Sequence, residues 1–159
     1  MSDNEVVLTA DGFKRLSEEL EDLTTVKREE ISARIKDARE FGDISENSEY
    51  NEAKNEQAKL EMRIEDLERK LRNARVLSGS EIKTDVVGIG SEVKLKDEKS
   101  GKTISFMVVG SAEADPGQSR FSNESPIGKA IMDHKAKDVV TVQTPRGNAK
   151  YKIISIKKG

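Results

Sequence analysis

The sequence predicts an α+β protein with a long N-terminal helical hairpin followed by a small C-terminal β domain. Between Phe13 and Leu77 there is no proline and only one glycine, Gly42. Apolar residues in this stretch recur at steps of three and four, which is the spacing of a coiled coil. After the helix-stopping run Ser78-Gly79-Ser80, the pattern changes to short alternating segments separated by turn residues. We therefore expect two domains that meet near residue 78.

The first arm of the hairpin is expected over about residues 13–40. Thr9 suits the N-cap position of its helix, and Asp11 lies in the first turn, where the helix dipole favours a negative charge. The apolar stripe along this arm slips by about one residue between Leu23 and Ile31. The members of the stripe are Phe13, Leu16, Leu20, Leu23, Ile31, Ile35 and Ala38.

The second arm is expected over about residues 48–75, with its end near Leu77. Two apolar stripes of similar length, joined by a segment with one glycine, are satisfied when they pack antiparallel. Each arm is then about 42 Å long at about 1.5 Å per residue. The result is a rod with an acidic tip over residues 42–49. The second stripe is unbroken and comprises Tyr50, Ala53, Gln57, Leu60, Ile64, Leu67, Leu71 and Ala74.

The hairpin domain is assigned to residues 1–78 and the β domain to residues 79–159. The β domain is expected to be a small antiparallel sheet with one short helix. Ser125 is the expected cap of that helix and Pro126 its first residue. Pro145-Arg146-Gly147-Asn148 has the composition of a hairpin turn. The expected strands include residues 93–95, 104–109, 139–144 and 149–156.

Charge is divided unevenly along the chain. Residues 1–78 carry 14 lysines and arginines against 20 aspartates and glutamates, whereas residues 79–159 carry 14 against 10. A hairpin with a net charge of −6 is unsuited to general nucleic-acid binding, which requires neutralisation of phosphates. The chain has no cysteine, which excludes disulfides and cysteine metal sites. With no signal-like run and no apolar stretch of about 18 residues, we expect a soluble cytoplasmic protein with no membrane segment.

The residue types that most enzymes use for catalysis are scarce. The only histidine, His134, lies in a polar stretch and is expected to be a solvated loop residue. No glycine-rich phosphate loop is present. What remains is the pair Asp43 and Glu46 at the bend, and magnesium is commonly held by one or two carboxylates together with substrate phosphates. The hairpin is therefore suited to complete a magnesium site in another macromolecule. The same spacing also fits a capping box, with Asp43 as N-cap and Glu46 at N3.

Several segments resemble the bacterial Gre transcript-cleavage factors, with the GreA type most similar. They are the tip Gly42-Asp43-Ile44-Ser45-Glu46-Asn47-Ser48-Glu49-Tyr50, residues 8–13, residues 125–128 and residues 144–147. The resemblance implies an FKBP-like C-terminal domain that docks at the rim of the RNA polymerase secondary channel while the coiled coil enters it. It also implies that the factor stimulates the polymerase's own hydrolysis of a backtracked RNA 3′ end and is not itself an enzyme.

The resemblance gives roles to particular residues. Asp43 and Glu46 would hold a magnesium ion shared with the polymerase active site and position the attacking water, so no cofactor is expected in the free protein. The remaining roles are tip support by Asn47, Glu49 and Tyr50, contact with the RNA 3′ segment by Arg39 and Lys54, and polymerase docking by Ser125, Pro126, Ile127 and Gly128.

Simpler interpretations remain open at many of these positions. Arg39 and Lys54 could be paired surface charges, and residues 125–128 could serve only as a turn and helix start. The neighbouring acids Asp37, Glu40 and Glu52 are expected merely to solvate helix faces.

Two other functions fit parts of the sequence. A Gre-like protein could occupy the polymerase channel as an inhibitor without promoting cleavage, although such relatives depart from the family at the acidic tip. A prolyl isomerase needs an aromatic-lined pocket, and residues 79–159 contain only Phe106, Phe121 and Tyr151. The expected partners are RNA polymerase and the RNA 3′ end, bound by a monomer.

Overall fold

The computed structural model describes residues 5–40 and 48–159, which fall into two compact units. The hairpin unit is Phe13–Asn73, and the sheet unit combines Met1–Gly12 with Ala74–Gly159. This division differs from the one predicted at residue 78, because the segments on both sides of the hairpin, residues 1–12 and 74–78, belong to the sheet unit. In the order of the chain, the hairpin is an insertion into the sheet unit.

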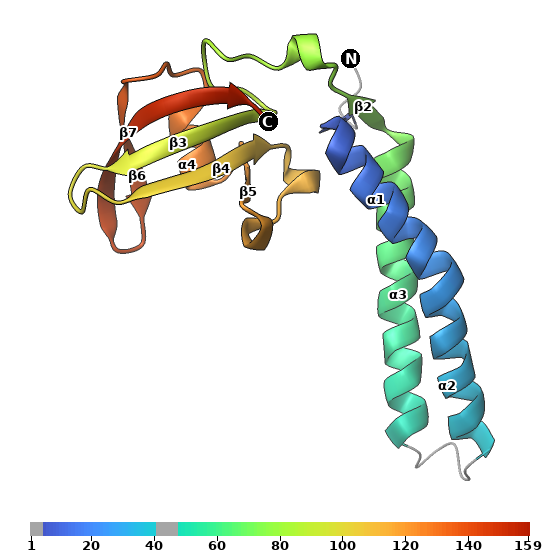
Figure 1. Cartoon of the computed structure of the whole chain (residues 1–159). Coiled ribbons are helices and arrows are strands. Elements are labelled where there is room, and N and C mark those ends of the chain that lie inside the picture. Colours follow the sequence, from blue (N-terminus) through green and yellow to red (C-terminus); the bar gives the residue numbers. More distant parts are fainter. Residues whose placement is uncertain (1–4, 41–47) are drawn as a thin grey trace. The chain divides into compact units, whose positions relative to one another are not determined.

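The hairpin unit consists of two antiparallel arms (Figure 1). The first arm contains α1 (Ala10–Asp22), the π-helical segment η1 (Leu23–Lys27) and α2 (Arg28–Glu40), and the second is α3 (Ser48–Arg72). All members of the unbroken second stripe are buried or half-buried, which confirms the coiled-coil prediction. None of the helices in the described ranges is long and apolar enough to cross a membrane.

The slip in the first stripe coincides with η1. A π turn holds one more residue than an α turn, because each N–H bonds to a carbonyl five residues earlier, as Arg28 does to Leu23. Leu23 and the next residue, Thr24, are both half-buried, so two consecutive residues face the second arm within this turn. The Thr24 hydroxyl donates to the Leu20 carbonyl at 2.9 Å, which gives this backbone acceptor a partner beside the widened turn. The extra residue thereby keeps the rest of the first arm facing the second.

Charged pairs join the two arms outside the seam. Arg28 donates to both carboxylate oxygens of Glu61, at 3.0 and 2.8 Å, and Arg34 pairs with Glu56. Earlier residues of the first arm meet later residues of the second, as antiparallel packing requires. Exposed pairs of this kind contribute only about 0.2–1 kcal/mol each, so we attribute to them a role in register more than in stability.

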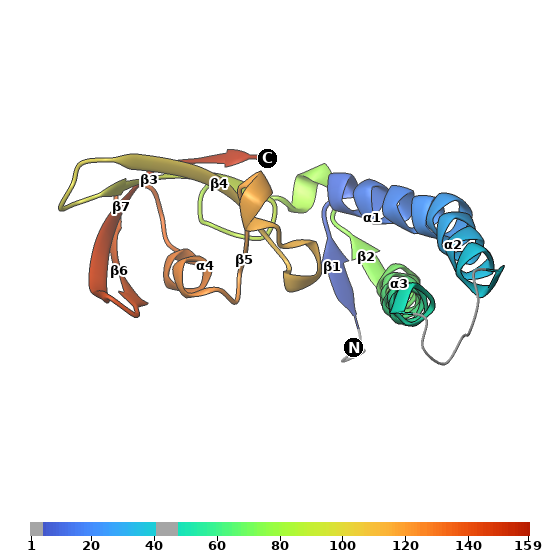
Figure 2. The ribbon, with the colours of Figure 1, turned by 90° about the horizontal axis from the view of Figure 1, so that it is seen from below.

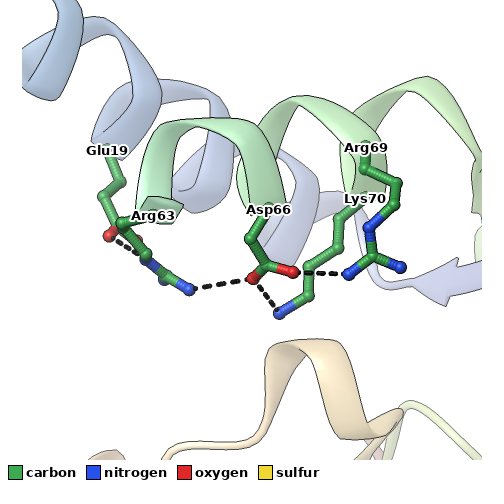
Figure 3. A network of polar contacts seen from close by, with 5 residues as sticks. All are labelled: Glu19, Arg63, Asp66, Arg69 and Lys70. Atoms are coloured by element: carbon green, nitrogen blue, oxygen red, sulfur yellow. Dashed lines mark hydrogen bonds and ion pairs between the residues drawn. The ribbon is translucent and has the colours of Figure 1, made fainter. Parts of the chain in front are cut away.

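Asp66 is the centre of a polar network on α3 (Figure 3). It accepts from Lys70 at 2.9 Å and from Arg69, and it lies 3.4 Å from a guanidinium nitrogen of Arg63. The hydrogen bond from Lys70 is the main cause that lowers the pKa of Asp66 below its ordinary value. Arg63 also donates two hydrogen bonds of 2.8 Å to Glu19, so the network reaches the first arm.

The sheet unit contains a five-stranded sheet in the order β5-β4-β3-β7-β6. Its pairs are antiparallel, as predicted, except that β5 joins β4 in parallel. The sheet curls around the short helix α4 (Pro126–Ile131) (Figures 1 and 2). Only Pro145 and Arg146 separate the last two strands, fewer residues than predicted. The strands are β3 (Ser91–Asp97), β4 (Thr103–Val109), β5 (Arg120–Ser122), β6 (Val139–Thr144) and β7 (Gly147–Lys158).

The core of the sheet unit lies between the sheet and α4. Phe106 is 2% exposed, and its ring meets Phe121 edge to face with the centroids 4.7 Å apart. Because these rings pack in or against the core, they are not available to line the aromatic pocket that a prolyl isomerase needs. The helical hairpin and the mostly antiparallel sheet with one helix confirm the predicted α+β class. The buried core residues are Val87, Val93, Leu95, Phe106, Val108, Ile131, Val140, Val142 and Ile153.

A second, two-stranded sheet lies where the chain leaves and re-enters the sheet unit. β1 (Val6–Leu8) pairs in parallel with β2 (Ala74–Val76), and neither strand was predicted. Because the chain turns into β2, α3 ends at Arg72 and not near Leu77. Immediately after β2, Glu81 accepts the backbone N–H of Ser78, and this hydrogen bond is the main cause that lowers the pKa of Glu81 to about 2.

A buried carboxylate of the sheet unit binds the N-cap of α1. Glu113 is 7% exposed and accepts the backbone N–H of Thr9 at 2.9 Å and its hydroxyl at 2.6 Å. Arg120 donates to Glu113 at 3.2 Å and to Asp11 at 2.7 Å. The Thr9 oxygen also accepts the N–H of Gly12, which confirms Thr9 as the N-cap. A Cβ on Gly12 would lie 2.2 Å from the Glu113 carboxyl carbon, so glycine is required for this close approach.

We predict that deletion of Thr25 from η1 leaves the hairpin intact. Without the surplus residue, the step from Leu23 to Ile31 shortens from eight residues to seven, which is one heptad, and the π turn becomes α-helical. The free energy of unfolding in urea should stay within about 1 kcal/mol of the parent value. Deletion of Glu65 from α3 is the control, because it turns Leu67 and Leu71 away from the seam and should cost about 3 kcal/mol or more. Equal losses in the two variants would contradict the assignment of η1 as the site of the extra residue.

We predict that Glu113→Ala destabilises the sheet unit by about 3 kcal/mol or more. The change removes the acceptor of the buried Thr9 N–H and hydroxyl, and it leaves the largely buried Arg120 with Asp11 as its remaining carboxylate. Chemical denaturation followed by circular dichroism would measure the loss. The exposed Glu98→Ala variant should stay within about 0.5 kcal/mol of the parent. A Glu113 variant as stable as the Glu98 variant would show that the buried cluster does not stabilise the sheet unit.

Candidate functional site

The centre of the predicted tip lies outside the described residues. Asp43, Glu46 and Asn47 belong to residues 41–47, as does Gly42, so their predicted roles stay predictions. No group of three or more histidine, cysteine or acidic side chains that could hold a metal is found among residues 5–40 and 48–159. The structure does describe the two helix ends that flank the tip.

Small side chains bring the two helices together close to the tip. Ala38 on α2 is 6% exposed and Ala53 on α3 is 1% exposed. Tyr50, predicted to support the tip, is half-buried at the first seam position of α3. The helices therefore stay packed to within a turn of Glu40 and Ser48, where the described part of each arm ends. This packing provides a firm base for the residues between them.

The charged residues predicted around the tip lie on the solvent side of the same helix ends. Arg39 lies in the last turn of α2, Glu49 lies in the first turn of α3, and both are exposed. Lys54 is exposed and donates to Gln57 of its own helix at 3.1 Å. The geometry thus brings both predicted basic residues to the tip end of the hairpin. Both side chains are open to solvent there.

The predicted docking patch is the start of α4. The Ser125 hydroxyl accepts the N–H of Gly128 at 3.2 Å and donates to the Ser122 carbonyl at 2.6 Å, which confirms Ser125 as the helix cap. Gly128 is buried, and a Cβ there would lie 2.1 Å from the Ser122 oxygen. Ile127 packs against the core, which leaves Pro126 as the exposed member of the patch. Most of this motif therefore has a structural role, and only a small part is available for contact.

A hollow of about 440 Å³ lies beside this exposed part. It is formed by α4, by the segment that precedes it and by the edge strand β6. Sequence reasoning identified only Pro126 of its lining, because no local pattern relates α4 to side chains on β6. The lining residues are Glu124, Pro126, Lys129, Ala130, Thr141 and Gln143.

The solitary histidine is exposed, as predicted. Its Nδ1 lies 3.1 Å from a carboxylate oxygen of Asp138. Asp138 also accepts the backbone N–H of Lys135, and this bond is the largest cause that lowers the pKa of Asp138. The pair is a surface turn contact on the β domain.

Comparison with known proteins gives matches along nearly the whole chain. Residues 6–76 match the family model "Transcription elongation factor, N-terminal", and residues 82–158 match "Transcription elongation factor, GreA/GreB, C-term". The chain is 54% identical to the transcription elongation factor GreA of Acetivibrio thermocellus over 157 residues, which is 99% of each protein. It is also 54% identical to GreA of Thermoanaerobacter pseudethanolicus, over 96% of this chain and 98% of that protein.

A solved structure is similar across the same length. The GreA factor homolog 1 protein of Thermus thermophilus is 35% identical to this chain, with a TM-score of 0.45. The match covers 96% of this chain and 99% of that one.

We predict that Gly128→Ala and Pro126→Ala have different effects on stability. The new Cβ at residue 128 meets a backbone oxygen and should cost about 1–3 kcal/mol. Pro126 is exposed at the first helical position, so its replacement should cost less than about 1 kcal/mol. Urea unfolding of both variants would test this. A Gly128 variant as stable as the parent would remove the structural explanation for this part of the motif.

Proposed function

The chain belongs to the GreA/GreB family of transcription elongation factors, and we propose that it acts as a GreA-type factor that stimulates transcript cleavage by RNA polymerase. The observation that carries this proposal is the 54% identity to GreA over 99% of both chains. Within this activity, we propose that the factor acts on backtracked complexes, in which the RNA 3′ end has left the active site. Cleavage then creates a new 3′ end and rescues the arrested complex.

The hairpin is proposed to carry the tip through the secondary channel of the polymerase. α3 contains 25 residues, which correspond to a length of about 38 Å. A two-helix rod is narrow. The cross-arm ion pairs Arg28–Glu61 and Arg34–Glu56 neutralise charges that would otherwise face the channel wall unpaired. These features support an element that reaches into a confined space and keeps its shape there.

Asp43 and Glu46 are proposed to complete a magnesium site only when the tip is in the polymerase. Two carboxylates are too few to form a closed metal cage, but they suit magnesium, which keeps several waters and binds substrate phosphates. A second metal ion at such a site orients and activates the attacking water. The contribution of this chain would be the two carboxylates, held by helices that are packed on both sides of the tip. The factor itself would then not be an enzyme.

Basic residues beside the tip are proposed to guide the RNA. Arg39 and Lys54 lie at the tip end of the hairpin and are exposed, so a phosphate can approach them from solvent. Asn47, Glu49 and Tyr50 are proposed to maintain the shape of the tip. Lysine at position 54 can act only as a point charge, without the bidentate geometry of arginine.

Polymerase docking is proposed to use the exposed end of the cap motif and the hollow beside it. Pro126 and Lys129 present an apolar surface and a charge on the same side of α4. Ser125, Ile127 and Gly128 would then act indirectly, by holding the helix in place. The free protein is proposed to be a monomer that contains no resident cofactor.

We predict that Asp43→Asn and Glu46→Gln abolish most cleavage without weakening the fold. Asparagine and glutamine can still cap a helix, so the loss of stability should be about 0.5 kcal/mol or less. Magnesium loses its charged ligands, so cleavage of RNA in a stalled, backtracked polymerase should fall by orders of magnitude and recover in part at high magnesium. Gel analysis of the shortened RNA and the released fragments would measure it.

The matched controls remove a carboxylate at the neighbouring exposed positions, Asp37→Asn and Glu52→Gln, and should cleave like the parent. The tip variants should still compete with the parent for polymerase. Parental cleavage by both tip variants would leave helix capping as the role of the two acids. A parent that competes for polymerase without any cleavage would identify the chain as a channel-binding inhibitor.

A further inference from the structure

The outer face of the curled sheet carries a group of lysines that the proposed function does not use. Along β3, buried Val93 and Leu95 alternate with outward Lys94 and Lys96. The neighbouring strand β7 adds further outward lysines across the pairs of the sheet. We call the five residues the lysine face: Lys94, Lys96, Lys150, Lys152 and Lys157. α4 lies on the opposite, concave face of the same sheet (Figure 2).

The charges of this face are not balanced within the described protein. Lys96 stands directly opposite Lys152 across the β3–β7 pair, and like charges in that position destabilise a sheet. None of the five lysines forms an ion pair with a carboxylate of residues 5–40 or 48–159. On the hairpin, by contrast, Arg28 and Arg63 are bound to carboxylates. The lysine face therefore keeps its charge available for a ligand from outside.

A small hollow on this face offers hydroxyl groups beside the lysines. Ser105 of β4 and Ser155 of β7 flank Lys94 in one row across the sheet. Together with Lys157 they line a hollow of about 90 Å³. Neither serine hydroxyl bonds to another described residue. Glu92 is the one carboxylate at the rim of the hollow. Two ammonium groups and two free hydroxyls form a donor set suited to a single phosphate.

We propose that the lysine face binds the phosphate backbone of single-stranded RNA. Lysines two residues apart on one strand are separated by about 6.6 Å, and neighbouring strands are about 4.8 Å apart. A flexible single strand can place successive phosphates against lysines at this spacing. No aromatic side chain lies at the outward positions of β3, β4 or β7, so contact is through phosphates and does not depend on base sequence.

This proposal rests on the proposed function for its choice of ligand. A backtracked polymerase extrudes the RNA 3′ segment, and a docked factor is then exposed to a free single strand. The lysine face would hold that strand at a second place, apart from the tip. Binding of RNA to the factor alone can be measured without polymerase, so this proposal can fail while transcript cleavage is retained.

The test compares two triple variants of the full chain that remove the same charge. Lys94→Gln/Lys96→Gln/Lys152→Gln alters the lysine face, and Lys14→Gln/Lys83→Gln/Lys135→Gln alters exposed lysines elsewhere. The probe is a labelled oligouridylate of about 12 nucleotides, followed by fluorescence anisotropy. Each phosphate contact lowers the logarithm of the binding constant by about 0.7 per tenfold rise in salt. Between about 50 and 200 mM salt, the parent should therefore lose roughly 20-fold more affinity than the face variant.

Support requires that the face variant binds RNA more weakly than the parent, that the control variant binds like the parent, and that duplex DNA of equal length binds no more tightly than RNA. Equal RNA binding by the parent and the face variant would overturn the proposal. Tighter binding of the duplex would overturn the choice of a single strand. If the face variant lost affinity for polymerase free of nucleic acid while RNA binding was unchanged, the face would be a protein-docking surface and the proposal would be wrong.

Discussion

The hairpin depends on one seam, because two helices have only one face each to bury against the other. The apolar residues of each helix must therefore stay on the face that meets the other helix. A single surplus residue would rotate all later residues by about 100° about the helix axis. The structure absorbs the surplus in η1, between Leu23 and Lys27, where the helix widens to π geometry. Packing continues beyond this turn as far as Ala38, next to the tip. The proposed chemistry of the tip therefore requires that the first arm keeps its apolar face toward the second arm beyond η1.

A second constraint acts within the sheet unit. Thr9 is both the N-cap of α1 and a hydrogen-bond donor to the buried Glu113 carboxylate, so the first turn of α1 is bound to residues of the sheet unit that follow it by about 100 positions in the sequence. Arg120 balances this carboxylate and reaches Asp11 with its other nitrogen. The N-terminal turn of α1 therefore belongs to the same compact unit as the side chains that bind it.

Sequence patterns were informative where the structure is periodic and silent where it joins distant segments. The start and the seam of the second arm were predicted because its stripe has no interruption, although the helix ends at Arg72 and not near Leu77. β3 was predicted because its lysines alternate with buried residues. The one-residue slip in the first stripe was visible, but a slip alone does not distinguish a π turn from a kink. Glu113 was missed because Thr9, which donates two hydrogen bonds to it, lies 104 residues away and no local pattern marks it. The strands β1, β2 and β5 have three residues each, which is too short for alternation to show.

The insertion of the hairpin into the sheet unit has a consequence for how the chain folds. Residues of the two arms that meet near the bend are close in sequence, so contacts between the arms can form there first and then extend along the hairpin. Contacts between residues close in sequence favour fast folding. Once the arms have closed, Leu8 and Val76 are neighbours although they are distant in sequence, and the parallel pair β1–β2 needs little further loss of chain entropy. Glu113 lies later in the chain, so its bonds to Thr9 cannot form until that part has been synthesised. During translation, the hairpin can therefore be complete before the five-stranded sheet has formed.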